Sequence, residues 1–84
     1  MNITVKYYSY LETIFGREST KIKVGKGATI NSLLAELSHN LDDDAQKAFK
    51  NVIILPLVNN NLVKLDYSLE EGDVVSLLVP MGGG

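Results

Sequence analysis

The 84-residue chain contains no cysteine and no tryptophan, and it has two prolines and one histidine. The absence of cysteine excludes a disulfide framework, a thiolate nucleophile and a zinc–thiolate site. His39 is near the end of a predicted helix, and it lacks the partners that a metal site or an acid–base pair would need. We interpret it as a solvated residue that the helix dipole favours. By itself the chain is therefore predicted to have no autonomous catalytic site and no metal site.

Clustered positive charge and long apolar runs are also missing. The eight lysines and arginines are scattered and the net charge is −2, which argues against a nucleic-acid partner. The longest apolar run, residues 52–58, contains Pro56 and is too short to span a bilayer. The N-terminus lacks the charged and apolar regions of a signal peptide. We therefore expect one small cytoplasmic domain without a membrane partner.

The first half of the chain combines strand and helix patterns. Apolar and polar residues alternate over 3–8 and again over 20–24, which predicts two half-buried strands. Between them, residues 10–16 are predicted to form a short helical turn that Gly16 ends. Thr29 is a predicted N-cap. The helix that follows has one apolar stripe, formed by Ile30, Leu33, Leu34, Leu37 and Leu41.

An acidic run, Asp42-Asp43-Asp44, follows this helix. A metal site would need more converging ligands than the run offers. Asp43 can instead cap a second short helix, with Gln46 three residues later completing a capping box. Acidic residues also favour a helix N-terminus, so we interpret the run as a helix start.

The remainder predicts three further strands, at residues 52–58, 62–65 and 74–79. Asn59-Asn60-Asn61 forms the first turn, because asparagine tolerates the left-handed region that tight hairpins require. Gly72 supplies the positive φ of the second turn. The predicted order is strand, strand, helix, strand, strand, strand, with no repeat and no linker.

The last strand is apolar on both faces. Val75, Leu77 and Val79 share one face, and Val74 and Leu78 lie on the other. A sheet that is covered by a helix on one side would leave Val74 and Leu78 in an exposed apolar patch, which commonly marks a docking surface. A strand buried on both faces is the alternative. The sequence predicts only one substantial helix, which can cover only one face of the sheet. We therefore predict that Val74 and Leu78 form a partner interface.

The chain ends in Pro80-Met81-Gly82-Gly83-Gly84. Glycine has no Cβ, so such a segment fits a channel that is too narrow for side chains. A frayed chain end is the alternative. We predict a folded domain at residues 1–79 and a flexible tail at 80–84. In this tail, Pro80, Met81, Gly82 and Gly83 are the segment that a partner binds, and Gly84 carries the reactive carboxylate.

Residues along the whole chain resemble the MoaD/ThiS family of sulfur carriers. The diagnostic positions are Val58-Asn59, Val63, Leu69, Gly72-Asp73, Val75, Pro80 and Gly83-Gly84, with Tyr8-Ser9, Leu11, Ile14 and Gly16 in the N-terminal half. The resemblance implies an α+β fold, the ubiquitin-like β-grasp, in which a mixed five-stranded sheet packs on one main helix. ThiS-like carriers usually have a shorter connector than residues 10–16. The chain is therefore more similar to MoaD, the small subunit of molybdopterin synthase.

The resemblance also implies a chemistry for Gly84. An E1-like adenylating enzyme of the MoeB or ThiF type would use ATP to convert the Gly84 carboxylate to an acyl-adenylate. A persulfide protein would then supply sulfur to give a thiocarboxylate. A large synthase subunit of the MoaE type would receive the tail, and the sulfur would pass to precursor Z. No cofactor would be bound by the chain itself.

Other functions share these features. A ubiquitin-like modifier would join its activated Gly84 to lysines of target proteins. A sulfur carrier for thiamin or for tRNA thiolation would use the same carboxylate with another acceptor. A plain interaction module would tolerate the loss of Gly83 and Gly84. The residues alone leave these alternatives open.

Overall fold

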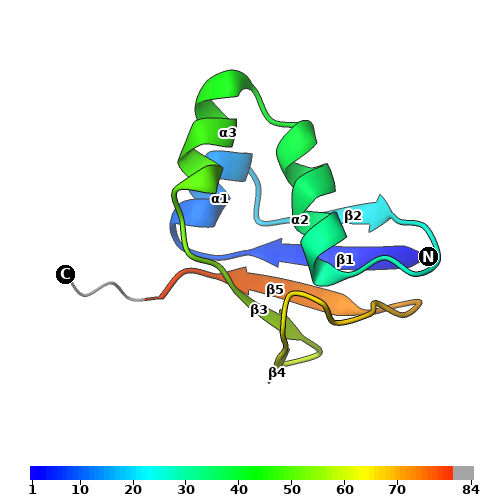
Figure 1. The fold of residues 1–84 in the computed structure, drawn as a ribbon. Coiled ribbons are helices and arrows are strands. Elements are labelled where there is room, and N and C mark those ends of the chain that lie inside the picture. Colours follow the sequence, from blue (N-terminus) through cyan, green and yellow to red (C-terminus); the bar gives the residue numbers. More distant parts are fainter. Residues whose placement is uncertain (81–84) are drawn as a thin grey trace.

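The computed structural model describes residues 1–80, which form three helices and five strands (Figure 1). The elements are β1 (Asn2–Tyr7), α1 (Tyr10–Phe15), β2 (Ser19–Lys23), α2 (Ile30–His39), α3 (Asp43–Lys50), β3 (Leu55–Val58), β4 (Asn61–Leu62) and β5 (Val74–Leu78). Within the described residues, none of the helices is long and apolar enough to cross a membrane.

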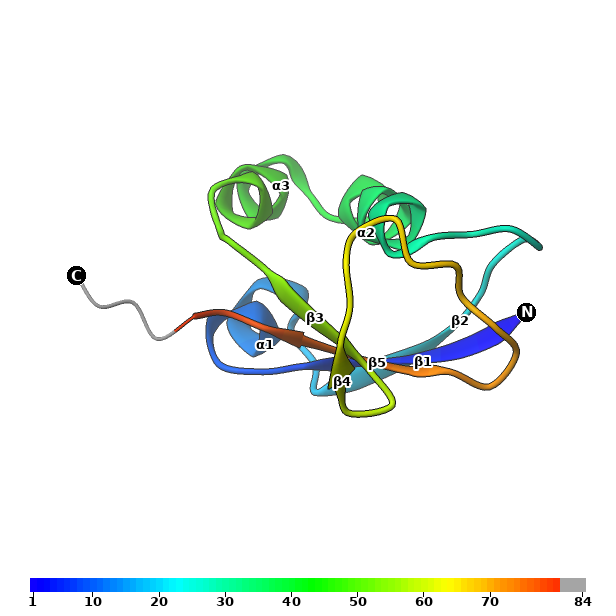
Figure 2. The ribbon, with the colours of Figure 1, turned by 60° about the horizontal axis from the view of Figure 1, so that its bottom comes forward.

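The strands form one mixed sheet in the order β2-β1-β5-β3-β4. The two central strands, β1 and β5, are parallel, and the other neighbouring pairs are antiparallel. Helices α2 and α3 lie over one face of this sheet, and α1 sits near the end at which β5 finishes (Figures 1 and 2). The predicted α+β architecture with a mixed five-stranded sheet is confirmed, and α2 is its longest helix.

The hydrophobic core lies between the helices and the inner face of the sheet. Its buried side chains come from all three helices, from strands β1, β3 and β5, and from two loop positions: Ile3, Val5, Tyr7, Leu11, Val24, Ile30, Leu33, Leu37, Phe49, Val58, Leu69, Val75 and Leu77. Burial of each large apolar side chain contributes roughly 1.5–3 kcal/mol, so this layer provides the main driving force for folding.

Three aromatic rings join α1 and α3 to the sheet. The rings of Tyr7 and Phe15 are stacked with their centroids 4.2 Å apart and an interplanar angle of 7°. Phe49 meets Phe15 edge to face at 5.2 Å. Both are preferred aromatic geometries, which add to the energy of burial. The stack fixes the short helix α1, which has only six residues, against the rest of the domain.

Burial of Tyr7 makes the stability of the domain sensitive to alkaline pH. Burial raises the pKa of the Tyr7 phenol from 10.0 to about 12, and the nearby Arg17 guanidinium opposes this rise. The folded state therefore holds the phenol proton more tightly than the unfolded state does. This contribution to stability is complete below pH 10 and is lost as the pH rises towards 12, by up to about 2–3 kcal/mol.

The control for this effect is Tyr7→Phe, which keeps the ring and removes the titrating group. Urea unfolding at a series of pH values should show a steeper loss of stability between pH 10 and 12 for the original chain than for the variant. Parallel curves for the two proteins would show that Tyr7 does not carry the pH dependence.

The predicted turns and caps are largely present. Gly16 ends α1 in the left-handed region at φ 70°, and its amide donates to the Glu12 carbonyl. Thr29 caps α2 through a capping box: the Ser32 amide donates to Thr29 Oγ1 at 3.2 Å, and the Thr29 amide donates to Ser32 Oγ at 2.9 Å. Gly72 has the expected positive φ, at 83°. These local signals were strong enough to place the element boundaries.

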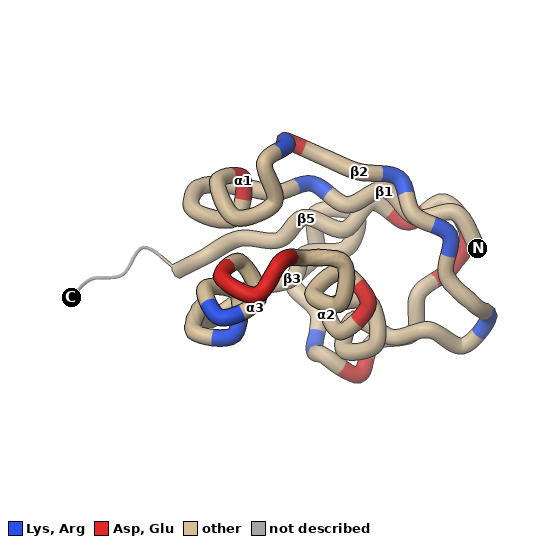
Figure 3. Tube along the Cα trace, turned by 90° about the horizontal axis from the view of Figure 1, so that it is seen from above, with Lys and Arg blue, Asp and Glu red and all other residues tan. Residues whose placement is uncertain are grey.

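The start of α3 differs by one residue from the prediction. Asp42, rather than Asp43, is the N-cap, and its Oδ1 accepts from the Ala45 amide at 2.8 Å. Gln46 does not complete a capping box with Asp43, because its side chain donates to the Leu41 carbonyl at 3.1 Å. The helix-start interpretation of the acidic run holds. Figure 3 shows acidic residues at one end of α3 and lysines at the other, as the helix dipole favours.

Two predicted strands are shorter in the structure. The strand expected at 52–58 begins at Leu55, because the end of α3 takes up the preceding residues: the Val52 amide donates to the Phe49 carbonyl at 3.3 Å. The strand expected at 62–65 ends at Leu62. The chain then turns towards α2, where the Asn31 amide donates to the Leu65 carbonyl at 2.8 Å. Contacts with the helices therefore replace sheet pairing at Val52 and Leu65, whereas the Val63 amide still donates to the Pro56 carbonyl of β3 at 3.1 Å.

Candidate functional site

Strand β5, which precedes the predicted tail in the sequence, lies at the centre of the sheet. Strand β5 has β1 on one side and β3 on the other, so its end is fixed by hydrogen bonds from both neighbours. Just beyond the strand, Val79 and Pro80 are half-buried. The predicted binding segment Met81–Gly83 and the predicted reactive residue Gly84 lie outside the described residues. The geometry of the site is therefore built from the strand end and the sheet faces beside it.

The inner face of β5 is buried, and on its outer face Ser76 is also buried, at 7% exposure, between two half-buried residues. Val75 and Leu77 point into the core and are completely buried. Val74 and Leu78 point to the opposite face, which the helices leave uncovered, and both are half-buried (Figure 2). The side-chain directions agree with the sequence analysis. A partner role for Val74 and Leu78 stays a prediction.

Strands β3 and β4 extend the apolar surface on this face. Leu55 pairs with Leu78, and Leu57 pairs with both Ser76 and Leu62, so these side chains point to the same side of the sheet. Leu55 is 39% exposed and Leu62 is 66% exposed. We call the set Leu55, Leu57, Leu62, Val74 and Leu78 the outer patch. Sequence reasoning named only the two β5 members, because the others join the patch through the pairing of β3 with β4 and β5.

Lysines border the outer patch on the other half of the same face. Lys21 pairs opposite Thr4, and Lys23 pairs opposite Asn2. The neighbours Ile3 and Ile22 point to the helix side, so Lys21 and Lys23 point outwards, and both are exposed. The outer face therefore joins an apolar half on β5, β3 and β4 to a basic half on β1 and β2. Such a surface suits a partner with an apolar centre and an acidic rim.

A polar clasp fixes the start of β5 to the β3–β4 turn. Asp73 is only 5% exposed. Its carboxylate accepts from Asn59 Nδ2 at 3.0 Å and from the Glu70 amide at 2.8 Å. Asn59 Oδ1 accepts in turn from the Val74 amide at 3.0 Å. Asn59 and Asn60 both have positive φ, at 50° and 72°. The clasp holds the outer-patch strands in register, and sequence reasoning did not anticipate it.

Loss of this clasp should destabilise the domain. In Asp73→Ala, Asn59 Nδ2 and the Glu70 amide lose their acceptor in a partly buried place. We expect the free energy of unfolding to fall by about 1–3 kcal/mol. Asp73→Asn keeps one side-chain acceptor and should lose less. Urea denaturation measures both variants, and equal stability of Asp73→Ala and the original chain would contradict the role of the clasp.

Comparisons with known proteins identify the family of the chain. The sequence model of the ThiS family matches residues 5–84, and the chain belongs to this family. A search of curated protein sequences found no match. The fold of the chain is the β-grasp, as the sequence analysis predicted.

Three solved structures illustrate the likeness. Putative molybdopterin converting factor subunit 1 from Pyrococcus furiosus is 23% identical, with a TM-score of 0.80, over 96% of this chain and 99% of the other. Small archaeal modifier protein 1 from Methanosarcina acetivorans is 22% identical, with a TM-score of 0.77, over 99% and 96%. A third match, 27% identical with a TM-score of 0.68 over 100% of both chains, is a complex of subunits 1 and 2 of the molybdopterin-converting factor from Helicobacter pylori.

The family match defines a broad class of function, and the likenesses at 22–23% identity show the fold. The chain is a β-grasp protein of the ThiS/MoaD sulfur-carrier type. The sequence analysis favoured the MoaD branch in particular. The comparisons support the broader class and do not distinguish its MoaD branch from the other branches.

Proposed function

We propose that the chain is a sulfur carrier for molybdopterin synthesis and acts as the small subunit of a molybdopterin synthase. The observation that carries this proposal is the position of β5: in a member of the ThiS family, this central strand contributes Val74 and Leu78 to the outer patch and ends two residues before Pro80, where the predicted tail begins. An adenylating enzyme or a large synthase subunit that docks on the outer patch would receive the tail at the same time.

The reaction places all the chemistry on Gly84. A carboxylate is ionised at neutral pH and is a poor electrophile, so an adenylating enzyme of the MoeB or ThiF type first joins it to AMP and releases pyrophosphate from ATP. A persulfide then attacks the acyl carbon, a C–S bond forms and AMP leaves. A thiol breaks the remaining S–S bond, which frees the Gly84 thiocarboxylate.

The tail gives this carboxylate access to two different active sites. Five residues span at most roughly 17 Å when extended, so Gly84 can enter a buried site while the domain stays outside. Pro80 fixes its own φ and thereby reduces the freedom lost on binding. The glycines add to this loss, so the affinity is expected to come mainly from the outer patch. Met81, Gly82 and Gly83 would occupy the partner's channel.

Reconstitution with a large subunit tests the molybdopterin assignment. The thiocarboxylated chain is mixed with a MoaE-type subunit and precursor Z, and formation of the dithiolene is followed. We expect product only when the chain carries sulfur on Gly84. If the thiocarboxylate forms but sulfur never reaches precursor Z, the molybdopterin role fails and the general carrier function remains.

Protein modification is the second candidate. The likeness to small archaeal modifier protein 1 favours it, and adenylation of Gly84 would be common to both functions. Recovery of lysine conjugates that end in Gly84 from cells would support the modifier. A thiocarboxylate without conjugates would support the carrier, whether its acceptor is a pterin, a thiazole or a tRNA.

A further inference from the structure

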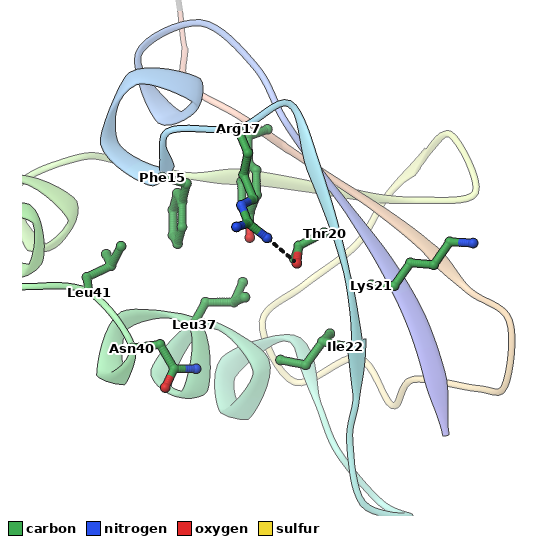
Figure 4. Close-up of a pocket in the computed structure, with 9 residues that line it drawn as sticks. Phe15, Arg17, Thr20, Lys21, Ile22, Leu37, Asn40 and Leu41 are labelled. Atoms are coloured by element: carbon green, nitrogen blue, oxygen red, sulfur yellow. Dashed lines mark hydrogen bonds between the residues drawn. The ribbon is translucent and has the colours of Figure 1, made fainter.

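A second concave site lies on the helix side of the sheet, away from the outer patch. It is a cavity of about 360 Å³ between the end of α1, strand β2 and the C-terminal end of α2 (Figure 4). Its volume falls within the range of small-molecule pockets, roughly 300–1,000 Å³. Its apolar lining consists of Phe15, Ile22, Leu37 and Leu41.

One cation reaches over this cavity. Figure 4 shows the Arg17 side chain directed to Thr20, and Nη1 donates to Thr20 Oγ1 at 3.3 Å. Within residues 1–80 the Arg17 guanidinium makes no ion pair with a carboxylate, and no acidic residue lines the cavity. Most of its N–H donors are therefore available to a ligand. The side chain of the neighbouring Lys21 extends away from the cavity, so Arg17 is the only cation directed at it among the described residues.

The hydroxyl of a largely buried tyrosine supplies a second donor. The Tyr7 side chain points inwards and lines the cavity, and only 3% of the residue is exposed. Its hydroxyl has no hydrogen-bond partner in the described part of the chain, and no fully buried side-chain oxygen or nitrogen there is left unpaired. The hydroxyl therefore keeps contact with open space, and Tyr7 is one of the residues that line this cavity. Its O–H is free to donate to a ligand or to water there.

We propose that this cavity, the Arg17 pocket, binds a small anion with an apolar body, either a carboxylate or a phosphate monoester. The guanidinium fork holds the anionic group, since its planar N–H groups match two oxygens of a carboxylate or phosphate. The Tyr7 hydroxyl donates a further hydrogen bond, and the apolar body packs on Phe15, Leu37 and Leu41. Burial raises the pKa of Tyr7 to about 12, so the phenol keeps its proton at neutral pH and acts as a donor.

Amide chemical-shift titration of the full ¹⁵N-labelled chain tests the proposal. Benzoate and phenyl phosphate are the two anionic probes, and benzyl alcohol is the neutral probe with the same ring. We expect saturable shifts at millimolar benzoate or phenyl phosphate, confined to amides around the pocket: Phe15, Arg17, Thr20, Leu37 and Leu41. The stronger of the two anions identifies the anionic group. No saturable shift with either anion, or equal binding of benzyl alcohol, would overturn the proposal.

Three variants locate the binding energy. Arg17 is exposed, so Arg17→Gln should fold normally and weaken probe binding at least tenfold through loss of a charge-assisted contact. Tyr7→Phe keeps the stacked ring and should weaken binding about threefold. Lys21→Gln makes the same charge change on a side chain that points away, and should bind as the original chain does. An equal loss in Lys21→Gln and Arg17→Gln would show non-specific attraction and would contradict the assigned site.

Discussion

Removal of Gly84 should abolish thiocarboxylate formation and leave the folded domain intact. The variant ends in Gly83, so a carboxylate is still present. The extended tail is shorter by one residue, so this carboxylate reaches about 3.5 Å less far from the domain. A misplacement of 1 Å at a reacting group can cost about a hundredfold in rate, so we expect a loss of at least that size. Gly84→Ala should also impair the reaction, because its Cβ adds bulk beside the reacting carbonyl in a narrow channel.

The matched control is His39→Gln. His39 is exposed in the last turn of α2, and we assign it no part in the chemistry. This variant should form the thiocarboxylate at the rate of the original chain. Thiocarboxylate yield after incubation with the adenylating enzyme, ATP and a sulfur donor is the readout, and far-ultraviolet circular dichroism checks the fold. Normal yield from the chain without Gly84 would rule out this residue as the reacting group.

Placing a carboxylate in the outer patch should weaken partner binding strongly. Leu62 is 66% exposed, so Leu62→Asp should leave the isolated domain folded. Burial of a leucine in an interface is worth roughly 1.5–3 kcal/mol, and a buried unpaired carboxylate adds a further cost. We therefore expect the dissociation constant for the adenylating enzyme to rise at least tenfold, and up to about a hundredfold. Val74→Asp and Leu78→Asp should act in the same direction.

Ile53→Asp is the control for this effect. Ile53 is 73% exposed, precedes β3 and lines the groove beside α2 and α3, on the helix side of the sheet. The substitution makes the same change of size and charge outside the outer patch, so titration calorimetry should give an unaltered affinity. Unchanged binding by Leu62→Asp, or an equal loss in Ile53→Asp, would show that the partner does not use the outer patch.

The elements that the sequence predicted well are those with local causes. The alternation at 3–8, the helical stripe behind Thr29 and the positive φ of Gly72 each depend on a few neighbouring residues. The predicted start of α3 was one residue too late, because either of two adjacent aspartates can act as an N-cap. The apolar run at 52–58 was assigned wholly to a strand because periodicity alone cannot divide such a run between a helix end and a strand.

The parts of the site that were missed depend on contacts between distant segments. Leu55, Leu57 and Leu62 join the outer patch only through the register of β3 with β4 and β5. The hydrogen bond between Asn59 and Asp73 links residues fourteen positions apart. No pattern within one strand contains this information, so the sequence could place Val74 and Leu78 on one face without defining the surface around them.

Intact-mass analysis of the chain tests most directly whether Gly84 carries the sulfur. The chain is incubated with ATP, its cognate adenylating enzyme and a persulfide donor, and the mass change is then localised by fragmentation. We expect the gain in mass that corresponds to replacement of one oxygen by sulfur, on Gly84 and dependent on ATP. A chain that keeps its original mass under these conditions, or that gains sulfur at any other residue, would contradict the assignment of Gly84 as the sulfur-carrying group.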